Sequence, residues 1–306
     1  MIKAENKSKI QRRQSYLRKN YQGYLLMLPY LAVFFLFTVW PVIMSIFYSF
    51  TSYNVFESPK FLGFENYVNL FFNDSVFLIA AQNTFQIAII VGPVSYLLSL
   101  FLAWMVNEFK NPWKTILTVV FYAPTLSNAV FTIWLIVFDG DIYGYLNSFL
   151  LEFGFINDPI QWRSDPQYMM MVVIIVQLWV SLGTSFLTLR AGFNTVDRQY
   201  YEAASLDGIK NRFQELWYVT LPMMAPHLML SAVLSITAAF TVSNVATVMT
   251  GFPSVNYATH TIMHHLQDYG TIRYQRGYAS AIATVLFLFS LFANKLAQKI
   301  IGRIGK

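Results

Sequence analysis

The chain has 306 residues, of which 56% are hydrophobic and 12% are charged, and its formal net charge is +6. Because a soluble domain carries roughly a quarter charged residues, this composition excludes an ordinary soluble protein and favours one that lipid solvates. There is no cysteine, which excludes disulfides, thiolate catalysis and thiolate metal sites.

Six hydrophobic stretches are long enough for membrane-spanning helices, which need about 20 apolar residues each. The sixth stretch is the weakest by length, but Lys295 and Lys299 can extend their ammonium groups from its end to the membrane surface. We therefore expect an all-α integral membrane protein with a membrane domain over 24–297, between basic tails at 1–23 and 298–306. The expected spans are 24–50, 77–105, 115–137, 168–189, 223–248 and 277–297.

Basic residues lie almost entirely on one side of these six spans. Seventeen of the 21 fall in the two tails, in the turn between the second and third spans, in the loop 190–222 and, as Lys295, at the end of the sixth span. Because positive charge is retained in the cytoplasm, we expect both termini and this loop to be cytoplasmic. The net charge is then a topology signal, and no nucleic-acid partner is expected.

The loop 190–222, between the fourth and fifth spans, has the pattern of two short helices joined by a tight turn. Asp197 is placed to cap the first helix, Gly208 to end it in a left-handed conformation, and Pro222 to separate the second helix from the next span. Small residues on the first helix permit close approach by another protein, with charge at the margins. These residues are Ala203 and Ala204, flanked by Glu202 and Asp207.

This loop resembles the coupling loop of permease subunits in binding-protein-dependent ABC importers. The resemblance rests on Glu202-Ala203-Ala204, Gly208 and the ending Val219-x-Leu221-Pro222. In that family the loop docks on the cytoplasmic ATPase, which implies coupling roles for Glu202, Ala203, Ala204, Asp207, Gly208, Leu221 and Pro222. The stretch between Gly208 and Val219 is one residue longer than the usual spacing, which turns the following helical face by about 100°.

Further segments, in the same order along the chain, resemble the carbohydrate-uptake branch of these permeases. They are Phe61 to Tyr67, Asn83-Thr84, Tyr122-Ala-Pro124 and the segment that begins Gly277-Tyr-Ala-Ser280. The resemblance implies a subunit of a bacterial plasma (inner) membrane importer that moves a sugar or oligosaccharide into the cell by alternating access. The partners it implies are a second homologous permease, two cytoplasmic ATPase subunits and an extracellular or periplasmic binding protein.

The chain contains no Gly-rich phosphate loop ending in Lys and Ser or Thr. We therefore expect ATP and Mg to bind the partner ATPase subunits, and we expect this chain to bind no cofactor and to be no enzyme itself.

Uncharged polar residues at helical spacing mark faces of the spans that turn toward other helices or a wet path. Hydroxyls and amides without charge suit a ligand rich in hydroxyl groups, and aromatic rings nearby can stack on sugar rings. The same small polar residues also mediate ordinary helix packing. The residues expected on the substrate pathway are Asn83, Asn128, Gln177, Trp179, Thr237, Phe240, Thr241, Ser243 and Asn244.

Two other functions stay open from the residues alone: an ion-coupled secondary carrier and a membrane-embedded enzyme. The spans hold no pair of ionisable residues suited to acid and base catalysis, and no acidic group near the midplane for proton coupling. His260 and His264 lie one helical turn apart, but no Glu is placed as in zinc peptidases. No metal site is therefore expected.

Overall fold

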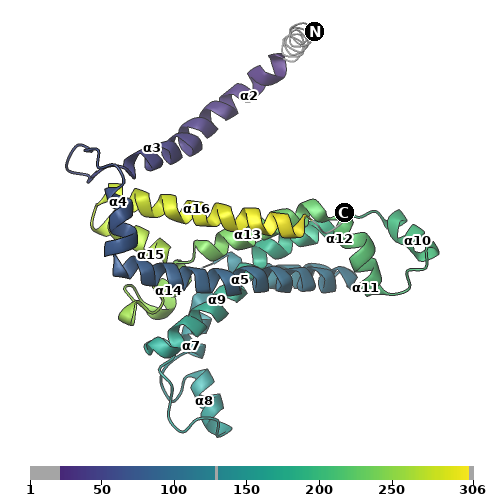
Figure 1. Ribbon diagram of the computed structural model, residues 1–306. Coiled ribbons are helices and arrows are strands. Elements are labelled where there is room, and N and C mark those ends of the chain that lie inside the picture. The colour runs from purple at the N-terminus through teal and green to yellow at the C-terminus, as the bar shows by residue number, and fades with distance from the viewer. Residues whose placement is uncertain (1–20, 128–129, 303–306) are drawn as a thin grey trace.

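The computed structural model describes residues 21–127 and 130–302 (Figure 1). Four helices in this part of the chain are long and apolar enough to cross a membrane, or five when a bent pair counts as one span. The chain is thus an all-helical membrane protein with four or five candidate spans, where the hydrophobic pattern predicts six. The candidates are Tyr21–Tyr48, Ser75–Glu108, Pro166–Phe193, Arg276–Ile301 and the pair Arg212–Met223 with Ala225–Phe240.

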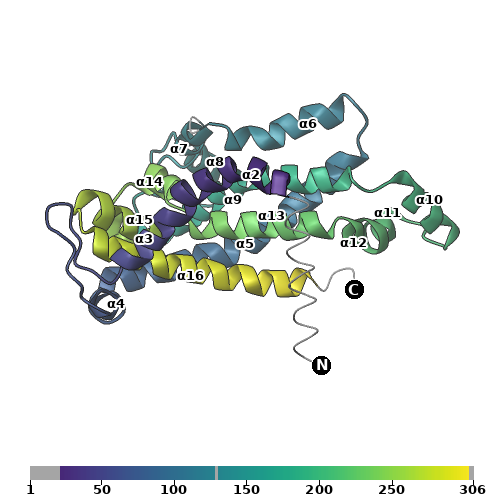
Figure 2. The ribbon, with the colours of Figure 1, turned by 90° about the horizontal axis from the view of Figure 1, so that it is seen from above.

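Four helices form the bundle (Figures 1 and 2). They are α5 (Ser75–Glu108), α9 (Pro166–Phe193), α13 (Ala225–Phe240) and α16 (Arg276–Ile301). Helix α13 contacts the other three. Buried serines line its contact with α9: the Ser185 and Ser235 hydroxyls are 2.6 Å apart, and Ser231 donates to the Ser185 carbonyl. Small hydroxyl residues let membrane helices approach closely while satisfying their own polar atoms.

The two ends of the bundle differ in charge. At one end, which we call the basic end, α5, α9 and α16 finish, and Lys110, Lys114 and Arg190 lie close to these helix ends. At the other, the acidic end, α5 and α9 begin at the capping residues Asp74 and Asp165. Figure 1 shows the short helices α4, α14 and α15 gathered at the acidic end and α10 to α12 at the basic end.

The remaining helices are short. They are α2 (Tyr21–Phe34), α3 (Trp40–Tyr48), α4 (Glu65–Val68), α6 (Trp113–Tyr122), α7 (Phe131–Val137), α8 (Tyr145–Glu152), α10 (Arg198–Leu206), α11 (Arg212–Glu215), α12 (Leu221–Met223), α14 (Asn244–Thr250) and α15 (Ile262–Gln267). The 3-10 turns are η3 (Ala123–Thr125) and η6 (Val255–Tyr257). The π-helical turns are η1 (Phe35–Val39), η2 (Asn69–Asn73), η5 (Leu216–Thr220) and η7 (Asp268–Ile272).

Two of the expected spans are divided. The described parts of 115–137 form α6, the turn η3 and α7, because Pro124 lacks the N–H that would continue the α-helical ladder. The stretch 223–248 ends as a helix at Phe240 and restarts at Asn244. Neither stretch is therefore the single continuous helix that the hydrophobic pattern predicts.

The helix that runs from α2 through η1 to α3 diverges from the bundle in Figure 1. None of its most apolar 18-residue window is buried inside the chain. This helix therefore needs lipid or another protein to cover its apolar surface.

The family-like segments 61–67 and 277–280 meet at the acidic end. The Asn66 side chain donates to the carbonyls of Ser49 and Thr51, 2.9 Å from each. The Gly277 amide donates to the Tyr53 carbonyl over 2.7 Å, and a Cβ on Gly277 would collide with the Thr51 carbonyl. These motif residues therefore fasten the first apolar helix to the start of α16.

Candidate functional sites: the coupling loop and a polar face of the bundle

The loop at the basic end begins with the helix that the sequence predicts. The Asp197 side chain accepts the Gln199 amide and caps α10, and Gly208 ends the turn with φ +94°. The second helical segment starts at Arg212, because the Asn211 side chain accepts the Gln214 amide and caps the helix there. From Arg212 the backbone continues as α11, η5 and α12, and this segment, Arg212–Met223, is bent by 83° from α13.

Burial divides the seven expected coupling residues. Ala204 and Leu221 are buried against the chain itself, and Pro222 is half-buried. The four that are exposed are Glu202, Ala203, Asp207 and Gly208. Only these four are free to meet another protein without a rearrangement of the loop.

The loop also presents apolar side chains that the sequence reasoning missed. Leu206, at the end of α10, is 89% exposed, and Phe213, Trp217 and Tyr218 are exposed on α11 and η5. They could have been recognised in the sequence as large apolar residues inside a charged loop. Exposed apolar groups at the tip of a projecting loop are typical of a docking surface.

Side-chain contacts connect the loop to the bundle. The Tyr201 hydroxyl lies 2.9 Å from the Thr220 hydroxyl, which joins α10 to η5. Arg212 pairs with Glu215 at 2.8 Å and with Glu108, at the end of α5, at 3.5 Å. These contacts join α10 to η5, and α11 to the end of α5.

The second candidate site is a polar face on α13 and α14, at the interruption between them. Thr237, Thr241 and Asn244 are exposed, and Ser243 is half-buried. The Thr241 hydroxyl donates to the Thr237 carbonyl over 2.9 Å. No charged side chain occurs in either helix, because the single ionisable residue of 225–250 is His227.

Buried hydrogen bonds stabilise the break between α13 and α14. The Thr261 hydroxyl donates to the Val242 carbonyl over 2.7 Å, and His264 Nε2 lies 3.0 Å from the Ser243 carbonyl. His264 Nδ1 accepts the Thr261 amide over 3.1 Å, so the proton of the neutral ring is on Nε2 and is donated to Ser243. The carbonyls of Val242 and Ser243, which lie in the interruption between α13 and α14, thereby gain hydrogen-bond partners, as membrane depth requires.

The other expected pathway residues are engaged in packing. The Asn83 side chain is buried and donates to the carbonyls of Tyr257 and His260, at 2.9 Å each. Gln177 is buried and donates to the Ser181 hydroxyl over 2.8 Å. Phe240 lies in the core, and half-buried Trp179 packs edge-to-face on Trp134. Asn128 lies outside the described residues.

Three histidine rings lie in contact near the acidic end: His264 stacks on His260, and His265 meets His260 edge-on. The ring centroid of His260 is 5.6 Å from that of His264 and 5.7 Å from that of His265. Burial, then the neighbouring His264 and His265, lower the pKa of His260 to about 3, and burial lowers that of His264 to about 4. Among the described residues, no three His, Cys, Asp or Glu side chains are placed to hold a metal ion.

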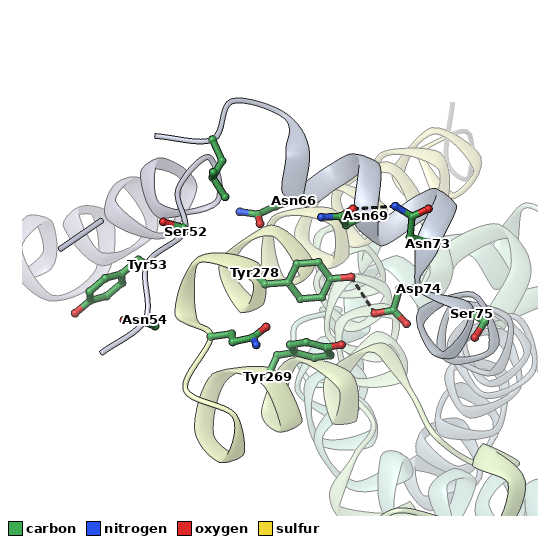
Figure 3. A pocket seen from close by; sticks show the side chains of 12 residues that line it. Ser52, Tyr53, Asn54, Asn66, Asn69, Asn73, Asp74, Ser75, Tyr269 and Tyr278 are labelled. Atoms are coloured by element: carbon green, nitrogen blue, oxygen red, sulfur yellow. Dashed lines mark hydrogen bonds between the residues drawn. The ribbon is translucent and has the colours of Figure 1, made fainter. Parts of the chain in front are cut away.

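A polar cavity of about 530 Å³ opens at the acidic end (Figure 3). It lies between the turn after α3, the helices α4 and η2, and the segment from η7 to α16. Its lining is rich in amides and hydroxyls, including Asn54, Asn66, Asn69, Asn73, Tyr269, Gln275 and Tyr278. The Asp74 carboxylate in its wall accepts the Tyr278 hydroxyl over 2.9 Å. The repeat of Asn66, Asn69 and Asn73 at helical spacing was the sequence signal for this cavity, and sequence reasoning did not use it.

An all-helical membrane chain with a projecting loop and an uncharged polar face is typical of a transporter subunit. The chain belongs to the family described as binding-protein-dependent transport system inner membrane component, which matches residues 95–306. It is thus the multi-pass inner membrane permease subunit of an ABC importer, and the ATPase is a separate subunit.

Several relatives cover nearly the whole chain. The probable ABC transporter permease protein YesP of Bacillus subtilis (strain 168) is 30% identical over 90% of this chain and 88% of its own length. The arabinooligosaccharides transport system permease protein AraP of the same organism is 27% identical over 95% of this chain and 91% of its own. A bacterial alginate ABC transporter, solved with an alginate pentasaccharide-bound periplasmic protein, shares the fold. It gives a TM-score of 0.75 at 20% identity and covers 95% of this chain and 98% of its own.

Proposed function

We propose that this permease subunit imports a sugar or oligosaccharide through a path lined by the polar face of α13 and α14. The observation that carries the proposal is that Thr237, Thr241 and Asn244 are exposed on a charge-free stretch of the bundle. Hydroxyls and amides can hydrogen-bond a neutral polyhydroxylated ligand and offer no ion pair to an anion.

The names of two relatives support the same substrate class: they are permeases for arabinooligosaccharides and for lactose in Rhizobium radiobacter. A third relative is a permease for sn-glycerol-3-phosphate in Escherichia coli, which is a phosphate ester. A phosphate ester would call for a cation near the path. The absence of Lys and Arg from 225–250 therefore favours a neutral sugar over a phosphorylated ligand.

The complete importer, in this proposal, contains a second homologous permease, two ATPase subunits and an external binding protein. The exposed apolar surface of α2 and α3 and the exposed face of α13 and α14 are surfaces that the second permease would cover. The ATPase subunits would contact the exposed part of the loop, namely Glu202, Ala203, Leu206, Asp207 and Gly208. ATP and Mg would then bind only those partner subunits.

Six spans and two cytoplasmic termini complete the proposed topology. The third span would consist of α6, η3 and α7 together, and the fifth of α13 with α14. Labelling of single cysteines placed at Lys210 and at Gly154 tests this arrangement, because the chain has no cysteine of its own. A membrane-impermeant reagent applied to intact cells should label the cysteine at 154 and leave the cysteine at 210 unlabelled.

Uptake measured in proteoliposomes that contain the whole importer tests the substrate class. Radiolabelled arabinotriose, galactotriose, lactose and glycerol 3-phosphate would be offered together with the cognate binding protein and internal or external ATP. ATP-dependent uptake of a neutral sugar supports the proposal. Uptake of glycerol 3-phosphate alone contradicts it.

A further inference from the structure

The polar cavity at the acidic end has walls from separate parts of the chain (Figure 3). They are the turn after α3, the segment from α4 to the start of α5, and the segment from η7 to α16. Hydrogen bonds fasten these walls to one another: the Asn66 side chain donates to the Thr51 carbonyl over 2.9 Å, and the Tyr278 hydroxyl donates to the Asp74 carboxylate over 2.9 Å. The cavity is therefore preformed, as small-molecule sites usually are.

Its volume and its access suit a small-molecule ligand. The volume of about 530 Å³ lies within the range of about 300–1,000 Å³ that is typical of ligand pockets. Ser52, Asn73, Ser75 and Gln275 line the cavity and are exposed. A ligand can therefore reach these side chains from solvent.

Polar groups in the lining have capacity left for a ligand. The side chains of Ser52, Ser75 and Gln275 form no hydrogen bond within the described part of the chain. Asn73 Nδ2 donates to Asn69 Oδ1 over 2.9 Å, which leaves Asn73 Oδ1 as an acceptor and Asn69 Nδ2 as a donor. The lining therefore presents donors and acceptors together.

The charge of the lining selects among hydrogen-bonding ligands. Asp74 is its one carboxylate, and the lining residues of the described chain include no Lys, Arg or His. The Asp74 oxygens already accept from His265, Phe77 and Tyr278. An anion would meet this negative charge with no cation to pair with, and a metal ion would find a single carboxylate that is already engaged. A neutral ligand whose hydroxyls both donate and accept fits best, and a saccharide has this chemistry.

We propose that this cavity is a second saccharide-binding site, in which Asn69, Asn73 and Gln275 bind the hydroxyls of a neutral sugar. Its ligand class rests on the proposed function, but the site lies apart from the proposed path, because no residue of α13 or α14 lines it. In the proposed topology the acidic end faces the outside, so the sugar reaches this cavity before it enters the path.

Protection of an introduced cysteine from alkylation tests the site, because the chain has no cysteine of its own. Ser75→Cys places a thiol in the lining. Ser164→Cys is the matched control, because Ser164 is exposed just before α9 at the acidic end and does not line the cavity. The importer, purified without its binding protein, is treated with a maleimide and arabinotriose, galactotriose or lactose, and the mass of this chain is measured. At least one sugar should slow labelling at 75 as its concentration rises and leave labelling at 164 unchanged.

Gln275→Ala, added to Ser75→Cys, tests the contacts. It removes an exposed lining amide and should leave the fold intact. The sugar concentration that gives half-maximal protection should rise about fivefold, which corresponds to about 1 kcal/mol for one hydrogen bond. Gln167→Ala should leave it unchanged, because Gln167 is an exposed glutamine at the start of α9, outside the cavity. If Ser75→Cys does not assemble, Asn73→Cys replaces it in the same lining.

Labelling at 75 that none of the three sugars slows overturns the proposal, and so does protection that Gln275→Ala leaves unchanged. Slowing by calcium chloride or by sugar-free binding protein, with no effect of sugar, overturns it in favour of a metal ion or a protein partner. Uptake in proteoliposomes judges the proposed function separately. Uptake of a neutral sugar without protection at 75 removes this site alone, whereas uptake of glycerol 3-phosphate alone, with protection by sugar, contradicts the proposed function alone.

Discussion

The Asp74 carboxylate and the His265 imidazole lie 2.9 Å apart and join the start of α5 to α15 at the acidic end. The same carboxylate accepts the Phe77 amide and the Tyr278 hydroxyl. Burial raises the pKa of Asp74, but hydrogen bonds from His265, Phe77 and Tyr278 outweigh burial and lower that pKa to about 2. One ionised side chain therefore fastens α5, α15 and α16 together.

Removing this charge should destabilise the chain. In Asp74→Asn the amide still caps α5 but loses the charge that His265 and Tyr278 share. Because hydrogen bonds to a charged group contribute about 1.5–3 kcal/mol, we expect a loss of that size in thermal unfolding of the detergent-purified importer. The matched control is Asp165→Asn, because Asp165 caps α9 through the Gln167 amide in the same way. Asn and Asp cap nearly equally, so this variant should lose less than about 0.5 kcal/mol. Equal losses would show that Asp74 acts only as a cap.

The buried histidines predict that stability falls at mildly acid pH. The folded chain holds His260 and His264 neutral, with pKa values of about 3 and about 4. An unfolded chain protonates them below about 6.5. The unfolded state thus binds more protons between pH 6.5 and 4, so stability is full above that window and is lost as the pH falls through it. Asp74, by contrast, contributes stability that is lost only between about pH 4 and about pH 2.

The substitution His260→Phe tests how much one of these two histidines contributes to the pH dependence of stability. Both ring nitrogens of His260 lack a hydrogen-bond partner among the described residues, and the ring stacks on Phe252. The charged and titratable groups that face it are His264, His265, Asp74 and Arg273. Phe keeps the stacking and cannot be protonated, so unfolding midpoints between pH 4 and 7 should vary less than in the wild type. An unchanged pH dependence would mean that His260 does not titrate in this range.

The sequence predicted the class of fold because the apolar composition and the length of each hydrophobic stretch follow from the need to cross a lipid bilayer, whatever the neighbouring helices are. It did not predict the helix breaks in the two divided stretches, since the hydrogen bonds that satisfy the break near 241 come from residues about 20 positions further along the chain. Thr261 and His264 supply donors to the carbonyls of Val242 and Ser243, and no local pattern near 241 indicates them. Hydropathy measures how apolar a stretch is. It does not detect a helix break whose free carbonyls accept hydrogen bonds from a segment distant in the sequence.

The site residues show the same limit at the level of single side chains. The periodicity of polar residues grouped Asn83 with Thr241 and Asn244, yet Asn83 is buried and bonded to the backbone of 257–260. A polar residue on a membrane helix looks alike in sequence whether it packs or lines a path. Only the position of the neighbouring segments separates the two roles.

The two asparagines should therefore behave differently when each is changed to alanine. Asn83→Ala removes the side-chain amide that donates to the carbonyls of Tyr257 and His260, and among the described residues only the Tyr257 carbonyl keeps a backbone donor, the His260 amide. The substitution should cost about 1–3 kcal/mol of stability, with lower yield of assembled importer. Asn244→Ala lies on the exposed polar face and should assemble normally while its transport rate falls. Yield after purification and initial uptake at several substrate concentrations separate these effects. Normal uptake by Asn244→Ala at every concentration would remove Asn244 from the proposed path.

Gly208 provides the sharpest test of the coupling loop. Its φ of +94° strains any residue with a side chain, and no atom lies within 4 Å of a Cβ added there. In Gly208→Val the β-branched residue should change the turn after α10 and displace the exposed docking surface. ATP hydrolysis in the purified complex should then proceed with transport reduced about tenfold or more, if about 1.4 kcal/mol or more of strain falls on the coupled state.

Gly154 supplies the matched control for this variant. It has φ +70° and equally open surroundings, but it follows α8 in the connection between α7 and α9, far from the loop. Gly154→Val should impose similar backbone strain and leave the number of ATP molecules hydrolysed per sugar unchanged. A ratio that rises in Gly208→Val alone places the effect in the loop, since general destabilisation would affect both variants. Wild-type uptake by Gly208→Val would contradict docking of the ATPase on this turn.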